Sequence, residues 1–423
     1  MRLDHLHIQN FRCYEDAHFD FQPGFNLVVG INGSGKTSLL QAVASSFHHF
    51  ATVMGKGNIS ITERDVRFSI DRFDERVRFE RRFPLQINSK GSLFGVTNLT
   101  VLKDRKDKQP NPDTNFHMAA SKELKRIDNG EQIDLPVLAF YRADRRWSSS
   151  GVSPEIAATT KISRLDGYID WSNSAVNLKN FEGWMIGKTL ERLQRLSRSK
   201  GTPEKYEDEL QWVNAALKYA LPESQGIEYD LELRNLLVSF NTNKTVPFND
   251  LSDGQRGLIT LIADIARRMC ILNPHMGKDV LRNTSGVVII DELDIHLHPA
   301  WQRTIVRALK TAFPKVQFIV ASHSPQIIGS LRPKEIIVLD NGDSSHPRVS
   351  YGLDSSRVLE EVMGVSQREP KVESLLSELF RALENNNLEE AKARLLSLKA
   401  EAPDLPEFAR AEALLKRKEI LGK

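Results

Sequence analysis

The sequence predicts an α/β fold with a mixed sheet, and two stretches of the chain carry most of this prediction. A β-rich run at residues 25–29 is followed by a glycine-rich turn and then, over residues 39–47, by apolar residues at helical spacing. Much later, two apolar strands at residues 286–290 and 316–321 flank a helix that begins near Pro299, because proline is favoured in the first turn of a helix.

Length and composition are ordinary for a soluble globular protein with two or three domains. The 423 residues are 40% hydrophobic and 27% charged, which excludes disordered and collagen-like chains. The net charge of +3 excludes a generally basic nucleic-acid-binding coat but leaves a local basic patch open. Cys13 and Cys270 are too few for a disulfide framework or a structural zinc site, so we expect a reducing, cytoplasmic setting. The apolar runs are too short for a membrane span, and the N-terminus is too polar for a signal peptide.

The pattern along the chain predicts a head at residues 1–345 and a C-terminal helical region at residues 346–423. Within the head, alternating and turn-rich segments indicate a β-rich excursion at about residues 51–134. Apolar residues at helical spacing indicate a helical lobe at about residues 151–250. The charged tail repeats leucines at helical spacing, and we expect it to serve oligomerisation or partner docking; a solvated helical cap on the core is the alternative.

The turn after the first apolar strand, GINGSGKT at residues 30–37, matches the P-loop pattern G-x-x-x-x-G-K-[ST]. Its glycines let backbone N–H groups point at phosphate oxygens, and the following helix adds the positive end of its dipole. We expect Lys36 to act in catalysis by neutralising the β- and γ-phosphates of ATP, and the Thr37 hydroxyl to ligate Mg²⁺. The expected nucleotide contacts here are Gly30, Asn32, Gly33, Ser34, Gly35, Lys36, Thr37 and Ser38.

A second motif is the apolar strand at residues 287–290, which ends in Asp291 and Glu292. Buried parallel strands deliver their carboxyl-terminal residues to the ligand crevice of an α/β sheet. We therefore expect Asp291 to hold Mg²⁺ directly or through water, and Glu292 to orient and polarise the attacking water as a general base.

Two further motifs complete a recognisable order. LSDGQ at residues 251–255 lies just before a predicted helix, and His323 follows the strand at residues 316–321. With the P-loop and the acidic strand end, this order resembles the ABC-type ATPases, although Asp253 departs from the commoner LSGGQ. The resemblance implies that His323 is a catalytic switch residue near the γ-phosphate. It also implies that a second subunit supplies the LSDGQ segment, which is the signature motif of the family. The signature residues expected to bind nucleotide are Ser252, Asp253, Gly254 and Gln255.

Four weaker signals accompany these motifs. The segment HLHP at residues 296–299 resembles the RecF/SMC-like and OLD-like branch rather than transporters; a metal cluster of its histidines with Asp294 is the competing reading. Arg12 in the segment NFR resembles a basic residue that lies near the nucleotide in RecF/SMC-type heads. Three arginines at residues 142–146 are expected to meet phosphates or to lie in a solvated loop. Asp65 is a candidate for the family's Q-loop position.

Motif order, size and tail together resemble the PtuA-type ATPases of Septu and some retron anti-phage systems. The sequence shows neither the sustained heptads of a long coiled coil nor the acidic cluster of a fused nuclease. The resemblance implies a cytoplasmic homo-oligomeric ATPase that binds ATP and Mg²⁺ and regulates a PtuB-like HNH nuclease, without a membrane partner. The alternatives are a RecF-like ATPase that binds DNA in repair, a scaffold that never turns over ATP, and a transporter subunit.

Overall fold

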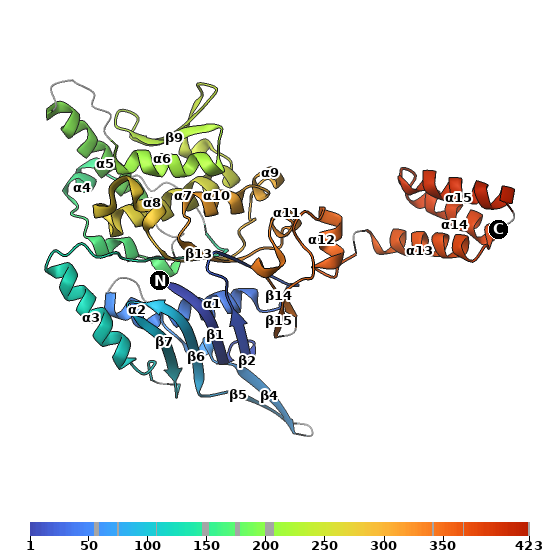
Figure 1. Cartoon of the computed structure of the whole chain (residues 1–423), viewed down its shortest axis with the longest axis horizontal. Helices are drawn as coiled ribbons and strands as arrows, with labels where there is room; N and C mark the ends of the chain where they lie inside the picture. The colour runs from blue at the N-terminus through green and yellow to red at the C-terminus, as the bar shows by residue number, and fades with distance from the viewer. Residues whose placement is uncertain are drawn as a thin grey trace. The chain divides into compact units, whose positions relative to one another are not determined.

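The computed structural model describes residues 1–54, 59–73, 76–106, 108–145, 152–173, 178–198, 207–340, 342–366 and 368–421, without the side chains of residues 71–73 and 76. The chain forms two compact units, Met1–Gly352 and Leu353–Lys423 (Figure 1). Along the described parts of the chain, no helix combines the length and the apolar character needed to cross a bilayer.

A six-stranded sheet lies at the centre of the first unit. In spatial order its described strands are β15 (Asp343–Ser345), β14 (Ile336–Asp340), β3 (Phe25–Val29), β13 (Val316–Ala321), β12 (Gly286–Ile290) and β8 (Val137–Tyr141). Every neighbouring pair is parallel except β14 with the edge strand β15. Strands β3, β8, β12 and β13 are buried at every position, as expected for a parallel sheet covered on both faces. This mixed sheet confirms the predicted α/β fold.

A four-stranded antiparallel sheet stands beside the central sheet. Its order is β2 (Tyr14–Asp20), β1 (Arg2–Phe11), β6 (Leu85–Leu93) and β7 (Val96–Lys103). Residues alternate over the middle of β1, where Leu6 and Ile8 are fully buried while His5 and His7 are partly exposed. Helix α1 (Lys36–Ser46) contacts β1, β6 and β7, which places the P-loop helix near the apolar face of this sheet (Figure 1).

The β-rich excursion contains more than strands. Strands β4 (Phe68–Phe73) and β5 (Arg76–Arg81) form a two-stranded ribbon that extends away from the four-stranded sheet (Figure 1). The same segment also contains helix α3 (Thr114–Asp128), which the β-rich interpretation missed. Asp113 caps this helix by accepting a hydrogen bond from the Phe116 N–H at 3.0 Å, and Phe116 and Ala120 are buried one turn apart.

The segment interpreted as a helical lobe also differs from expectation. It contains the long helices α5 (Leu178–Arg198) and α6 (Glu209–Ala220), as expected, and also a three-stranded antiparallel sheet. The strands of that sheet are β9 (Ser224–Asp230), β10 (Asn235–Phe240) and β11 (Thr245–Pro247). Ile227 and Tyr229 are buried on one face of β9, a period of two that the helical interpretation overlooked.

The remaining helices of the first unit surround the central sheet. They are α2 (His48–Met54), α4 (Pro154–Thr159), α7 (Asp253–Leu272), α8 (Val280–Asn283), α9 (Pro299–Gln302), α10 (Ile305–Ala312) and α11 (Pro325–Ile328). Helix α7 is tied to β8 by buried charges. Asp264 accepts hydrogen bonds from Arg268 at 2.7 Å, Arg267 at 2.6 Å and the Tyr141 hydroxyl at 2.8 Å. Arg268 also donates to the carbonyls of Gly167 and Ile169.

The second unit is helical. Its helices are α12 (Ser355–Glu361), α13 (Pro370–Glu384), α14 (Leu388–Glu401) and α15 (Glu407–Leu421). The last three share one small apolar core, made of Leu376, Leu379, Ala382, Leu383, Ala391, Leu395, Leu398, Phe408, Ala411 and Leu415. This core gives the tail a packing centre of its own.

Candidate functional site

The sheet topology brings the separate sequence motifs to one edge. The P-loop follows β3, the acids follow β12, His323 follows β13, and the arginine segment follows β8. These four strands are parallel neighbours in the order β3, β13, β12, β8, so their carboxyl ends lie at the same edge of the sheet. Parallel sheets bind ligands at this edge.

The P-loop wraps around its own lysine. Lys36 is buried, and its Nζ donates hydrogen bonds to the carbonyls of Gly30 at 2.9 Å and Ile31 at 2.8 Å. Gly35 has φ of +100°, and a Cβ at this position would lie 2.7 Å from the Tyr14 hydroxyl oxygen and 2.9 Å from the Cys13 sulfur. Only glycine fits this turn, which therefore brings the start of β2 against the loop.

The Thr37 hydroxyl donates a hydrogen bond to Asp291 Oδ2 at 2.9 Å, which joins the P-loop to the acidic strand end. Burial raises the pKa of Asp291, although Thr37, Arg145 and Lys36 oppose this rise. Burial likewise lowers the pKa of Lys36, against the opposing effect of Asp291 and Glu292. Both groups are partly shielded from water and lie among opposite charges, a setting in which a bound ion and phosphates would interact strongly with them.

The residues present fit ATP with Mg²⁺. Thr37 and Asp291 supply two adjacent oxygen donors, the ligand type that Mg²⁺ prefers. Ser34 Oγ, inside the P-loop, is buried without a hydrogen-bond partner among the described residues, although buried hydroxyls normally have one. A phosphate oxygen in the loop would be such a partner.

Glu292 sits in a strained turn that Arg145 holds in place. Its φ of +50° lies in the left-handed region that non-glycine residues seldom adopt. The Arg145 guanidinium donates to the carbonyl of Asp291 at 2.5 Å and to that of Glu292 at 2.6 Å. Burial lowers the Arg145 pKa, against the nearby acids. The sequence interpretation had all three arginines of this segment facing phosphates or solvent; Arg145 instead clamps the acidic turn, and Arg146 lies outside the described residues.

His323 is half-buried, and its loop is tied to the turn after Glu292. Asp294 Oδ1 accepts a hydrogen bond from the Ser322 hydroxyl at 2.6 Å and a longer one from the His323 N–H at 3.4 Å. Asp294 is therefore a positioning residue that sequence reasoning considered only as a metal ligand. His296 and His298 do not form a metal-ligand cluster with it within the described residues. The His298 ring instead accepts a hydrogen bond from the Ala300 N–H.

The signature segment begins helix α7. Ser252 caps the helix in a reciprocal pair with Gln255, and both Ser252 and Asp253 are exposed. Gly254 is buried against the turn after Glu292, because a Cβ there would lie 2.3 Å from the His296 carbonyl oxygen. No hydrogen bond or ion pair between described residues joins the signature to the P-loop of the same chain. The exposed signature is thus free to face another molecule.

Arg12 lies beside the P-loop but points at a carboxylate. Its guanidinium donates to Asp65 Oδ1 at 2.7 Å, and its backbone N–H donates to the Asp65 carbonyl. Asp65 is buried and caps its own short turn through Thr62. The two candidate residues that the sequence left separate, Arg12 and Asp65, are therefore one ion pair.

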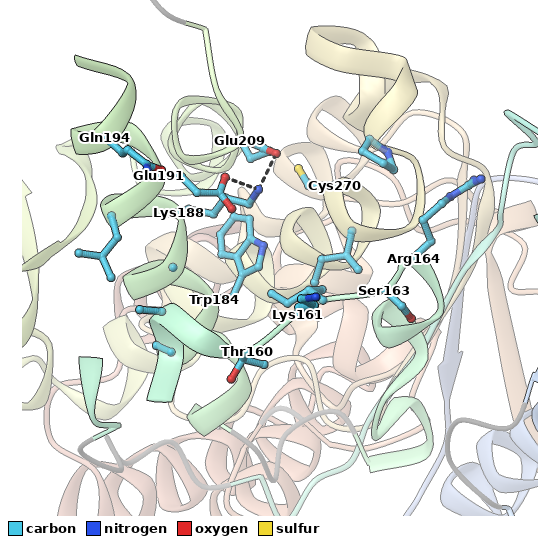
Figure 2. Close-up of a pocket in the computed structure, with 17 residues that line it drawn as sticks. Thr160, Lys161, Ser163, Arg164, Trp184, Lys188, Glu191, Gln194, Glu209 and Cys270 are labelled. Atoms are coloured by element: carbon cyan, nitrogen blue, oxygen red, sulfur yellow. Dashed lines mark hydrogen bonds and ion pairs between the residues drawn. The ribbon is translucent and has the colours of Figure 1, made fainter. Parts of the chain in front are cut away.

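A cavity of about 830 Å³ lies away from this edge, between α4, α5, α6 and the end of α7. Figure 2 shows Lys188 paired with both Glu191 and Glu209 there, at 3.0 Å each, beside Trp184. The cavity lining contains none of the motif residues. Of the three cationic side chains that line it, Lys188 is paired with two carboxylates and Arg164 donates to the backbone carbonyls of Leu272 and Ile133.

Comparison with known proteins gives a consistent family likeness. A family model described as "AAA domain, putative AbiEii toxin, Type IV TA system" matches residues 25–329. The chain is 27% identical over 425 residues to "Retron Ec83 probable ATPase" of Escherichia coli, covering 88% of this chain and 78% of that protein. It is 21% identical over 403 residues to "Septu protein PtuA" of Bacillus thuringiensis, covering 92% and 90%.

Solved structures give a weaker likeness. An Smc head domain derived from Pyrococcus furiosus, with an extended coiled coil and bound to the C-terminal domain of ScpA, is 14% identical, with a TM-score of 0.42. The match covers 82% of this chain and 95% of that one. A likeness at this level adds nothing to the fold assignment, which follows from the order and direction of the strands.

Proposed function

The chain is an ATPase of the family described as "AAA domain, putative AbiEii toxin, Type IV TA system", and we propose that it binds ATP between two copies of itself and thereby regulates an associated HNH nuclease in anti-phage defence. The observation that carries the nucleotide site is the 2.9 Å contact of Thr37 with Asp291, beside Lys36 and Glu292 at the carboxyl edge of the sheet. We place this activity in the cytoplasm.

In the proposed site the P-loop binds the phosphates and the strand ends do the chemistry. Lys36 leaves the carbonyls of its own loop to neutralise the β- and γ-phosphates. Thr37 and Asp291 would hold Mg²⁺, which would neutralise part of the phosphate charge. Glu292 orients the attacking water and accepts its proton. His323 reaches the γ-phosphate from the neighbouring strand.

The second half of the site comes from another copy of the chain. Ser252 and Asp253, at the start of α7, are exposed, and the positive end of the helix dipole there suits an anion. Among the described residues, no hydrogen bond or ion pair joins this segment to the P-loop of the same chain, and in our proposal a second copy brings it to the phosphates. Gly254, packed on the turn after Glu292, would link closure of the dimer to the catalytic acid of the same copy.

ATP turnover and assembly test this proposal together. Glu292→Gln should keep ATP binding, lower the hydrolysis rate by about 10²–10⁴-fold and prolong the ATP-bound dimer. Light scattering with and without ATP and Mg²⁺ measures the dimer, and phosphate release measures turnover. Glu232→Gln, at an exposed residue of the first unit outside the motifs, is the matched control and should behave as wild type. A wild-type chain that neither binds ATP nor changes its assembly with it would refute the site.

The nuclease partner needs its own experiment. We propose that the helical unit of residues 353–423, which has a core of its own, docks the partner or a further copy. Co-expression with a neighbouring gene for a small HNH protein should yield one complex of defined mass. The chain ending at residue 352 should keep ATP binding and lose the complex. Equal recovery of the partner with both chains would remove the tail from docking.

A second candidate function is direct DNA binding, as in RecF-like repair. The β4–β5 ribbon favours it, because Phe68 and Phe79 stack with ring centres 5.5 Å apart and are 44% and 60% exposed. Exposed rings of this kind stack on bases. Its described arginines are already engaged, since Arg78 pairs with Glu80 and Arg81 donates to the Val66 carbonyl. DNA binding by the isolated chain that weakens steeply with salt, and that Phe79→Ala removes, would favour the repair function.

A further inference from the structure

The outer face of the β1–β2 hairpin carries an unusual cluster of histidines and aspartates. His5, His7 and Gln9 alternate along β1, and Asp16, His18 and Asp20 alternate along β2. In the antiparallel register His7 lies directly opposite His18, with His5 opposite Asp20 and Gln9 opposite Asp16. The intervening residues Leu6, Ile8, Ala17 and Phe19 are buried, so the whole polar set projects from one face of the sheet.

Three of these side chains converge on one point. His7 Nε2 lies 2.9 Å from Asp16 Oδ1, and His18 Nε2 lies 3.5 Å from the same oxygen. One ligand atom from each of His7, Asp16 and His18 lies within 4.8 Å of the other two, and this is the one such group within the described residues. Ligands of a tetrahedral Zn²⁺ ion, with bonds near 2.1 Å, are about 3.4 Å apart. The two distances from Asp16 Oδ1 lie on either side of this value, and the His7 and His18 rings stack with their centres 4.0 Å apart.

Each of the three side chains also has a supporting partner. Gln9 Nε2 donates to Asp16 Oδ2 at 2.9 Å, and the Asn88 amide lies 3.5 Å from His7 Nδ1. His18 Nδ1 lies 3.4 Å from His5 Nε2, and His5 Nδ1 lies 2.8 Å from Asp20 Oδ1. With protons on His18 Nδ1 and His5 Nδ1, a chain of hydrogen bonds would run from His18 through His5 to Asp20. His18 Nε2 would then be free to bind a metal. Such partners orient metal-binding histidines.

We propose that His7, Asp16 and His18 bind one divalent transition-metal ion of the Zn²⁺ class on the outer face of the hairpin. Two imidazoles and one carboxylate match Zn²⁺ and exclude Mg²⁺ as the natural occupant, because Mg²⁺ prefers oxygen ligands alone. The ion would take three protein ligands and one water. It would crosslink β1 to β2, whose Tyr14 hydroxyl donates to the Gly35 carbonyl of the P-loop at 3.1 Å.

Metal titration of the full untagged chain tests the site without nucleotide or partner. Zn²⁺ should bind at one ion per chain, and Co²⁺ should give the intense visible bands of a four-coordinate site. The double variant His7→Ala/His18→Ala should lose this ion. The side chains of His7 and His18 are 20% and 59% exposed, and both lie on the outer face of the sheet. We therefore expect the double variant to fold, which circular dichroism and ATP binding will verify.

Two single variants sharpen the result. His5→Ala removes only a supporting partner and should weaken Zn²⁺ binding about 10–100-fold at unchanged stoichiometry. His117→Ala, on the distant helix α3, is the control and should bind as wild type. A wild-type chain that binds no Zn²⁺ at micromolar concentration, or a double variant that binds it as wild type does, overturns the proposal. Neither result depends on whether the chain hydrolyses ATP.

Discussion

At the scale of single residues, the proposed catalytic turn at Glu292 depends on side chains that no motif contains. Glu292 was predicted from its place at the end of an apolar strand, and the structure adds the strain of its φ of +50°. The residue that holds this conformation, Arg145, lies in the segment after β8 and donates its hydrogen bonds to backbone carbonyls. Sequence reasoning could not identify it, because a carbonyl partner leaves no pattern in the sequence. Asp294 was considered only as a ligand in the competing metal reading, because its partners, the Ser322 hydroxyl and the His323 N–H, lie at the end of another strand.

Arg145→Lys should therefore impair turnover without unfolding the protein or weakening ATP binding. A lysine amine lacks the planar pair of donors that spans the carbonyls of Asp291 and Glu292, so the carboxylate of Glu292 would lose its fixed position. We expect kcat to fall by about 10–100-fold with KM nearly unchanged, as a misplaced catalytic group would give. Steady-state kinetics measure both values, with Arg142→Lys as the control from the same segment. A change confined to KM would place Arg145 in nucleotide binding instead.

At the scale of elements, the sequence predicted the strands that are buried on both faces. It did not predict the segments in which helices and strands alternate. Apolar runs define β3, β12 and β13 directly, since each is buried at every position. Helix α3 was missed because its capping residue, Asp113, follows a proline-rich loop that resembled a hairpin. The sheet of β9, β10 and β11 was missed because its short alternation lies next to strongly helical sequence.

Helix α7 joins the signature to the core through buried charges, and this predicts a large stability effect. Burial tends to raise the pKa of Asp264, but Arg268 and Arg267 lower it to about 2. Asp264→Asn should cost about 3–5 kcal/mol of unfolding free energy, because two buried arginines lose their counter-charge. Urea unfolding at neutral pH measures the loss. Asp253→Asn, which breaks an exposed pair with Arg256 on the same helix, should stay within about 1 kcal/mol of wild type.

The pH dependence of this effect has a definite sign. A carboxyl whose folded pKa is depressed stabilises the fold above its unfolded pKa of about 3.9, and this contribution is lost as the pH falls toward 2. The difference between wild type and Asp264→Asn should therefore be constant above about pH 5 and shrink below about pH 4. A difference that grows on acidification would show that Asp264 is not ionised in the folded protein.

At the scale of the whole molecule, a site shared between two copies predicts that two different inactive variants restore activity when they are mixed. Lys36→Ala disables the P-loop of its own copy, and Ser252→Arg blocks the exposed signature that it offers to a partner. Homodimers of either variant then have two defective sites. A mixed dimer has one site with both defects and one with an intact P-loop facing an intact signature. Mixing the two inactive variants in equal amounts should restore up to about a quarter of wild-type ATPase activity, since half of the dimers are mixed and each has one working site.

This mixing experiment distinguishes a site shared between subunits from a site formed within one chain. If the signature served the P-loop of its own chain, each variant would stay inactive in any mixture, because no chain would contain both intact elements. Mixing each variant with wild type is the control, and it fixes how freely subunits exchange. Activity that rises with the fraction of mixed dimers requires ATP to lie between subunits. Helix α7 suits this arrangement. The buried pair of Asp264 and Arg268 fixes the second half of the helix in the core, while Ser252 and Asp253 at its start are exposed.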